Sequence, residues 1–231
     1  MEKPLATSTE GLAGLIKLVE SKKLITMMGQ SYRFHEGVLE TKKILESGIM
    51  GLPQVATSYW GSYLPDWHST EDYRREYAAQ KKLGGGAMFT LMSHTLDLFV
   101  WLFGDFVEYS GTRERLSDLE IDVDDTAIIT GVSKRSVRIE AKNDFITKTP
   151  QHTLTIVGTD GTLVTDFITH TLHLSTHDGS EKNFTYTFEP NHRYKEELRY
   201  FVSLVERQEA DPSLTIARGA HIVELMTDPR I

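Results

Sequence analysis

The chain has 231 residues, of which 39% are hydrophobic, so it can bury a sizeable core in one large domain or in one domain plus a fragment. Its formal net charge is −8 and no block of Lys and Arg recurs, which argues against a nucleic-acid partner. The absence of cysteine excludes disulfides, thiolate catalysis and zinc–thiolate sites, and it suits a reducing cytoplasm.

The first predicted elements alternate between helix and strand. Apolar residues at helical spacing predict a helix over Ser8–Lys23, and the apolar run Leu24–Met28 predicts a short buried strand. A second helix is predicted over Glu36–Ser47, which Gly48 ends, and a second strand over Pro53–Trp60. A helix that leads into an apolar strand is typical of half a βαβ unit.

The middle of the chain predicts a loop and two helices. Aromatic residues crowd an irregular loop over Gly61–Thr70, and a polar helix is predicted over Glu71–Gln80. Three glycines at Gly84–Gly86 break the chain before a long apolar helix over Ala87–Phe103, which ends at Gly104.

Short alternating strands follow from Phe106 to Phe188. The clearest are Thr126–Val132, Ser136–Ala141 and Thr153–Val157, and two Asp-Gly pairs predict hairpin turns at 159–162 and 177–180. Helices are predicted again over Asn191–Gln208 and Ile216–Met226. We therefore expect an α/β (α+β) fold in which a large, mostly antiparallel open sheet carries helices on one face.

No feature of the sequence points to a membrane. The N-terminus has no apolar stretch typical of a signal peptide, and the longest uninterrupted apolar run, Leu98–Phe103, is too short to cross a bilayer. We expect a cytoplasmic protein without membrane or nucleic-acid partners.

Glu2-Lys3-Pro4 is the first candidate for chemistry. A lysine that a turn holds in place can bond to a substrate hydroxyl, and with a lowered pKa it can take the proton that the hydroxyl loses on oxidation. The alternative is an ordinary exposed N-terminus.

His94 and Asp97 are the second candidate, because a spacing of three places them on one face of the apolar helix. An oriented imidazole with a pKa near neutrality is a good general acid or base. The alternative is a buried histidine that bonds only to the backbone.

The aromatic loop is the third candidate. It contains Tyr63-Leu64-Pro65-Asp66-Trp67-His68 and is followed by Tyr73-Arg74-Arg75. Aromatic faces stack on sugar rings, and Asp and Arg bond to hydroxyls or phosphates. The alternative is that these aromatics fill the core, and the composition alone slightly favours it.

No metal site is expected. His170 and His173 point to opposite faces of a strand, so they do not converge with His177, and no His-Glu-x-x-His motif is present. The glycines at 84–86 do not form a phosphate loop either, because they lack the Gly-x-Gly-x-x-Gly and Gly-Lys-Ser/Thr patterns.

Together, four segments in order resemble the Gfo/Idh/MocA family of oxidoreductases. Glu2-Lys3-Pro4 resembles the family's Glu-Lys-Pro motif, and the segment from Gln30 to His35 resembles the exit from its nucleotide domain. Residues 84–104 resemble the glycine-rich loop and catalytic helix, and residues 154–163 resemble a hairpin of the family's sheet.

The resemblance implies a fold and a set of roles. The family joins a Rossmann domain to an α/β domain, uses NAD or NADP, and acts mostly on sugars, cyclitols and sugar nucleotides. By this resemblance Lys3 and His94 are catalytic, and Glu2, Lys3, Gln30 and Arg33 lie near the cofactor. Trp67, Tyr73, Arg74 and Asp97 line or support the pocket for a sugar or sugar nucleotide, and the sheet forms a homo-oligomer.

Two departures from the family pattern bear on activity. Thr90 stands where many members carry an aspartate, four residues before the catalytic histidine, so Lys3 and His94 must do more of the proton transfer. Residues 1–34 resemble only a remnant of the Rossmann domain, ahead of a substrate-binding and oligomerisation domain over 35–231, and the Gly-x-Gly-x-x-Gly turn that cradles pyrophosphate is missing. The alternative function is a non-catalytic sugar-binding or oligomerising remnant that does not bind the dinucleotide.

Overall fold

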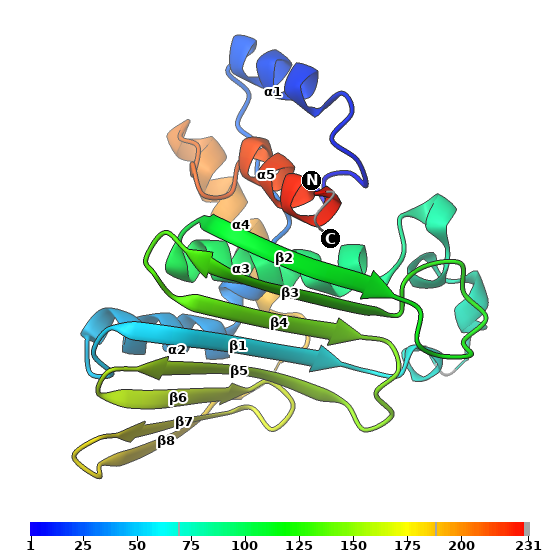
Figure 1. The fold of residues 1–231 in the computed structure, drawn as a ribbon. Helices are drawn as coiled ribbons and strands as arrows, with labels where there is room; N and C mark the ends of the chain where they lie inside the picture. The colour runs from blue at the N-terminus through cyan, green and yellow to red at the C-terminus, as the bar shows by residue number, and fades with distance from the viewer. Residues whose placement is uncertain (69, 188, 229–231) are drawn as a thin grey trace.

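An eight-stranded open sheet forms the centre of the computed structural model, which describes residues 1–68, 70–187 and 189–228 (Figure 1). Ser69 of the predicted loop, Phe188 at the end of the predicted strand block, and Pro229–Ile231 lie outside the described residues. The strands are β1 (Pro53–Gly61), β2 (Phe106–Glu114), β3 (Thr126–Ser133), β4 (Arg138–Asp144), β5 (Gln151–Gly158), β6 (Gly161–Asp166), β7 (Thr171–Thr176) and β8 (Glu181–Thr185).

The strand order is β2-β3-β4-β1-β5-β6-β7-β8. Every neighbouring pair is antiparallel except β1 and β4, which run parallel. The prediction of a mostly antiparallel open sheet is confirmed, as are the hairpin turns at 159–162 and 177–180, which connect β5 to β6 and β7 to β8.

Alternation of side chains gives the sheet one buried face. Along β4, Ile139, Ala141 and Asn143 are buried, whereas Arg138 and Lys142 are exposed, because successive residues of a strand point to opposite faces. The buried face packs on helices, and the other face carries no helix from the described residues (Figure 1).

The helices are α1 (Leu12–Ser21), α2 (Glu36–Ser47), α3 (Ser93–Phe103), α4 (His192–Arg207) and α5 (Ile216–Thr227). Helix α2 contacts β6 and β7, and α3 contacts β4, so these two cover the sheet directly. Helix α5 packs on α3, and α1 packs on α5, so α1 lies farthest from the sheet (Figure 1). The predicted arrangement of helices on one face is therefore confirmed.

The apolar stretch that ends in α3 is the core of the protein. Residues 81–103 are long and apolar enough to cross a membrane by length and composition, but nearly all of their most apolar part, from Gly85 onwards, is buried inside the protein. Burial against the sheet explains the apolar composition, as in the core helix of a globular domain.

The predicted strand at Leu24–Met28 is wrong. The segment has no regular secondary structure and joins no ladder of the described sheet. Its backbone bonds elsewhere: the N-terminal amine of Met1 donates to Met27 O at 2.7 Å, and Met28 N donates to Leu214 O at 2.7 Å. These two contacts satisfy backbone groups that a partner strand would otherwise satisfy.

The predicted helix at Glu71–Gln80 is also wrong, because this segment forms two short 3₁₀ turns, Tyr73–Arg75 and Tyr77–Ala79. The Asp72 carboxylate accepts from Arg74 N at 3.1 Å, a local bond that competes with a helix. Ala78 O accepts from Gly86 N at 2.9 Å, so tertiary contact with the glycine loop also sets the path.

Candidate active site

The N-terminus holds Lys3 against the core. Gly29 N donates to Met1 O at 2.6 Å, which fixes the first residues beside the 27–29 segment. A Cβ at Gly29 would lie 3.2 Å from that same oxygen, so glycine permits the close approach. Lys3 Nζ donates to the backbone carbonyl of Thr90 at 2.6 Å, which connects the N-terminus to the start of the buried helix.

The glycine loop fixes how that helix starts. Gly86 has a φ of +103°, and a Cβ there would lie 2.5 Å from Asp124 Oδ1, so only glycine fits. Asp124 accepts from Met88 N at 2.8 Å through its carboxylate. The first turn, Met88–Met92, is a π-helix, a widened turn that is frequent at functional sites. Thr90, whose carbonyl binds Lys3, lies in this turn.

Burial shapes the chemistry of Lys3. It lowers the pKa of the Lys3 amine to about 8, while Glu2 raises this pKa and Arg193 lowers it further. At neutral pH a measurable fraction of the amine is therefore unprotonated and able to accept a proton.

His94 lies at the start of α3 among aromatic rings. Its ring centroid is 5.1 Å from that of Tyr32 and 6.0 Å from that of Trp60. Burial first, and then the positive charges of Lys3 and Arg193, hold the His94 pKa well below its usual range, so the imidazole is neutral. Its Nδ1 has no hydrogen-bond partner within the described part of the chain, which leaves it available to a ligand.

Two strands place a stacked pair of aromatic rings next to His94, and the sequence pattern did not predict this pair. Trp60 on β1 and His152 on β5 are direct cross-strand partners, and their rings stack with centroids 4.1 Å apart. A cavity of about 10 Å³, enough for about one water, lies between these rings and α3. The inward positions of both residues along their strands were a usable signal, but only the register shows that they meet.

His35 and Arg193 also belong to this cluster and were missed. His35 caps α2 by accepting from Gly37 N at 3.1 Å, and its ring stacks on Tyr32 at 5.7 Å. Burial, followed by the charge of Arg193, lowers the His35 pKa to about 4. Arg193 on α4 lies with Cζ 4.3 Å from the ring centroid of Tyr32.

Arg33 and Asp97, predicted near the cofactor and substrate, form a buried ion pair instead. Arg33 Nε and Nη2 donate to the two carboxylate oxygens of Asp97 at 2.7 and 2.6 Å, and Arg33 Nη1 donates to Ser213 Oγ at 3.0 Å. Both side chains are nearly inaccessible, with 3% and 2% of their surface exposed. The pair connects the 31–34 turn to α3 and leaves neither group facing a ligand.

Trp67, Tyr73 and Arg74 were predicted to line or support the pocket, but each bonds to a loop residue of the protein. Trp67 Nε1 donates to Ser62 Oγ at 2.8 Å, and the Tyr73 hydroxyl accepts from Glu120 N at 3.2 Å. Arg74 forms exposed ion pairs with Asp72 and Glu120. These contacts account for the three side chains without a ligand.

Glu2 is exposed beside Lys3, whereas Gln30 is buried. Gln30 Oε1 has no hydrogen-bond partner among the described residues, so this buried acceptor is unsatisfied. An unsatisfied acceptor close to the segment that holds Lys3 is consistent with a ligand contact.

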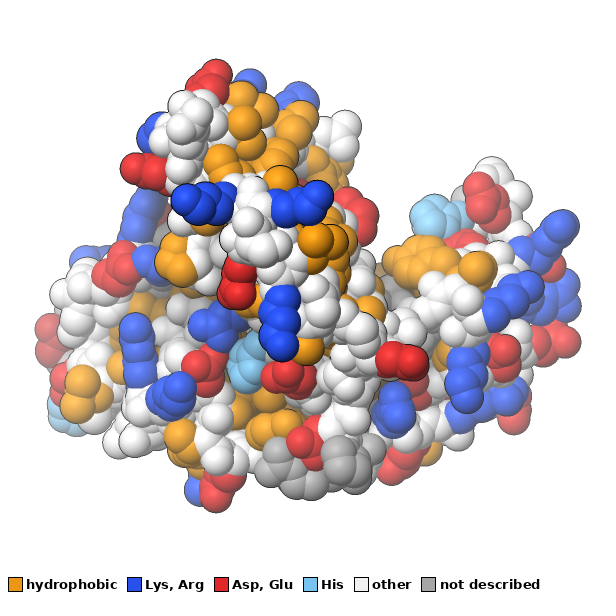
Figure 2. Space-filling view, turned by 90° about the horizontal axis from the view of Figure 1, so that it is seen from above, with side chains coloured by type: hydrophobic (Ala, Val, Ile, Leu, Met, Phe, Trp, Pro, Cys, Tyr) orange, Lys and Arg blue, Asp and Glu red, His pale blue; other side chains and the backbone are white. Residues whose placement is uncertain are grey.

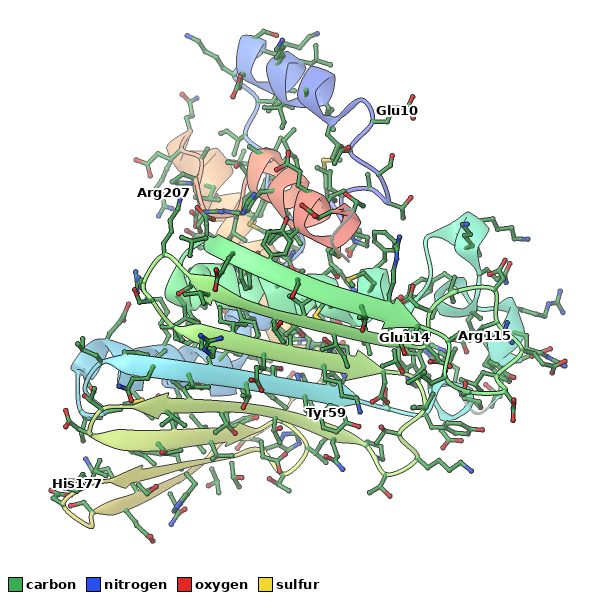
Figure 3. The ribbon with its side chains drawn as sticks, viewed as in Figure 1. Glu10, Tyr59, Glu114, Arg115, His177 and Arg207 are labelled. Carbon is green, nitrogen blue, oxygen red and sulfur yellow. The ribbon has the colours of Figure 1, made fainter. Side chains whose placement is uncertain are left out.

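The three C-terminal histidines of the strand block do not converge on one point. His173 Nδ1 bonds to Asn183 Oδ1 at 2.7 Å across β7 and β8, and His177 lies at the tip of that hairpin (Figure 3). No group of three His, Cys, Asp or Glu side chains within residues 1–68, 70–187 and 189–228 is arranged to hold a metal ion.

Residues 38–164 match the family model described as the GFO/IDH/MocA C-terminal domain. D-apiose dehydrogenase of Rhizobium rhizogenes is 24% identical over 170 residues, which cover 70% of this chain and 46% of that protein. An uncharacterized oxidoreductase of Synechocystis is 25% identical over 176 residues, which cover 71% and 47%. The chain therefore spans about half the length of the curated relatives it matches.

Solved structures share the fold over almost the whole chain. A levoglucosan dehydrogenase in complex with NADH and levoglucosan superposes with a TM-score of 0.85 at 18% identity, covering 97% of this chain and 68% of that protein. An oxidoreductase from Agrobacterium radiobacter in complex with NAD⁺, L-tartaric acid and magnesium gives a TM-score of 0.80 at 19% identity, covering 97% and 67%.

The buried ion pair gives a first prediction. Arg33→Met leaves Asp97 charged and unpaired, so we expect the free energy of unfolding to fall by about 3–5 kcal/mol in urea denaturation. The double variant Arg33→Met, Asp97→Leu removes both charges and should recover most of that loss. The control Arg74→Met breaks an exposed pair and should have little effect. A double variant as unstable as the single one contradicts this account.

The buried histidines predict acid sensitivity. Burial holds the folded-state pKa of His35, His94 and His152 below the unfolded value, so the unfolded state binds more protons as the pH falls below about 6.5. Stability is therefore present above that pH and is lost as the pH falls towards the folded pKa values. His152→Phe keeps an aromatic ring and should reduce the loss of unfolding free energy between about pH 7.5 and about pH 5, measured in urea. An unchanged pH slope in this variant contradicts the assignment.

Proposed function

Since the chain belongs to the GFO/IDH/MocA family, we propose that it is the catalytic and substrate-binding part of a nicotinamide-dependent oxidoreductase. The reaction is hydride transfer at the hydroxyl- or carbonyl-bearing carbon of a sugar or sugar nucleotide. The observation that carries the proposal is the bond from Lys3 Nζ to Thr90 O, which positions a lysine of lowered pKa close enough to lower the pKa of His94.

The residues present fit a nicotinamide cofactor, NAD(H) or NADP(H). A carboxamide offers both a donor and an acceptor, and the buried Gln30 Oε1 is an acceptor that lacks a partner among the described residues. Lys3, Glu2 and Gln30 would hold the ring. The nicotinamide supplies the acceptor or donor for the hydride. Arg33 would support the cofactor site indirectly, because it pairs with Asp97.

Lys3 and His94 handle the proton. When an alcohol is oxidised, its hydroxyl proton passes to the unprotonated amine of Lys3, and the ammonium that forms donates to Thr90 O. The neutral imidazole of His94 bonds to the same hydroxyl through a ring nitrogen and orients it. A threonine side chain at position 90 cannot take the proton, so the backbone carbonyl of this residue, rather than a carboxylate, stabilises the lysine.

Residues 1–34 belong, in this proposal, to the nucleotide-binding side, and residues 35–231 to the substrate-binding side. Exposed apolar side chains on the 1–34 segment and α4, including Leu18, Leu24, Leu198 and Val202, support contact with a further nucleotide-binding segment. Figure 2, which looks down on this side, shows hydrophobic side chains gathered among interspersed acidic and basic ones.

The test uses the longest reading frame that contains this chain. We expect calorimetry to show binding of NADH or NADPH, and sugar oxidation, followed by NADH absorbance, to rise with pH and reach half its plateau near the Lys3 pKa of about 8. Lys3→Met should lower kcat by about 10²–10⁴-fold, whereas the control Lys17→Met, an exposed lysine of α1, should not.

Two results would contradict the catalytic proposal. If the Lys3→Met enzyme has the wild-type kcat, Lys3 does not accept the proton. Sugar binding without any dinucleotide binding supports the alternative of a non-catalytic sugar-binding or oligomerising module.

A homo-oligomer formed through the sheet is part of the same proposal. The face without helices carries Tyr59 (Figure 3) and the exposed apolar side chains Ile128 and Val157. Burying this face against a second copy would remove apolar area from water. We expect light scattering to show an oligomer that Val157→Glu dissociates; a wild-type monomer contradicts it.

A further inference from the structure

Arg193 is a half-buried cation with an incomplete set of partners. Its guanidinium lies over the ring of Tyr32, with Cζ 4.3 Å from the centroid, and its Nη2 donates to the Tyr194 hydroxyl at 2.8 Å. Its Nε is buried and has no hydrogen-bond partner among the described residues. An N–H group buried in this way is costly unless an acceptor reaches it.

The other basic side chains of α4 are partnered differently. His192 contacts Glu36, Lys195 contacts Glu189, Arg199 contacts Glu196, and Arg207 contacts Glu209. Arg193 shares in none of the ion pairs that the described residues form, and its partners are the rings and hydroxyls of Tyr32 and Tyr194. The one arginine of this helix that faces the cluster of rings is therefore the one without a carboxylate.

The charge of Arg193 reaches every basic group of the candidate site. It lowers the pKa of Lys3, His35, His94 and His152. The carboxyl of Glu197 on the same helix offsets this charge only in part, because burial and then Glu2 raise the Glu197 pKa to about 7. The side chain of Thr90 adds no negative charge to the site.

We propose that the substrate is an anionic sugar whose carboxylate or phosphate group contacts Arg193. The inference rests on the proposed function, since it concerns the substrate of that site. Guanidinium is the side-chain group best matched to carboxylates and phosphates, and an anion that reaches the unpartnered Nε would satisfy it and pair with the charge of Arg193.

Calorimetry with three matched sugars tests this on the full 231-residue chain. D-glucose is neutral, D-glucuronate adds a carboxylate and D-glucose 6-phosphate adds a phosphate at the same carbon. We expect one of the two anions to bind about tenfold or more tightly than glucose, and which one does so identifies the anionic group. Arg193→Met should reduce that anion to the affinity of glucose, while Arg199→Met, the same change on the same helix, should keep the preference.

A second measurement does not depend on the fold of any variant. In the wild-type chain the preferred anion should raise the pKa of His35 from about 4, followed by NMR, because it offsets the charge of Arg193. Glucose should leave this pKa unchanged.

Each outcome separates this inference from the function it rests on. Equal affinities for glucose and both anions, no binding of any of the three, or an anion preference that survives Arg193→Met overturns the inference. Loss of NADH affinity in Arg193→Met with sugar binding intact also overturns it, by assigning the arginine to the cofactor. A charge preference that holds in a protein without dinucleotide binding overturns the dehydrogenase proposal alone.

Discussion

The ion pair between Arg33 and Asp97 holds together the two segments on which the candidate site is built. Arg33 belongs to the short 3₁₀ turn Ser31–Phe34, and Asp97 belongs to the buried helix α3. One residue before the arginine, Tyr32 packs on His94, which lies one turn before the aspartate. Because a bidentate pair tolerates little movement, the ring of Tyr32 and the imidazole of His94 keep a fixed separation. Arg193 packs on the same Tyr32 ring.

Most of the fold could be predicted because its signals are local. Alternation along β4 and apolar spacing in α2 identify the faces that are buried, and the Asp-Gly turns identify hairpins. The two failures have different causes. Residues 24–28 form no strand because Met28 N bonds to Leu214 O, which lies far away in the sequence. Residues 71–80 form no helix because Arg74 N bonds to the Asp72 side chain and Gly86 N bonds to Ala78 O.

The candidate site, like the fold, could be predicted from the sequence only in part. The spacing of His94 and Asp97 predicts a shared helix face but not that the aspartate is already occupied by an arginine 64 residues away. Trp60 and His152 meet only because β1 and β5 pair in a particular register, and Arg193 joins them because the chain returns to the cluster after the last strand. Trp67, an aromatic residue that stands out in the sequence, bonds to Ser62 and packs on Phe145 of the core instead of joining the rings around His94.

The position of β1 has a consequence for how the sheet assembles. Strands β4 and β5 are consecutive in the chain, yet β1 lies between them and pairs with both. They cannot close on each other as a hairpin without excluding the strand that belongs there. The two halves of the sheet are thus joined through a segment made much earlier during synthesis, by pairings far apart in sequence, which is the kind of topology that folds slowly. The same strand contributes Trp60, so the stacked pair of Trp60 and His152 forms only when β1 has paired with β5.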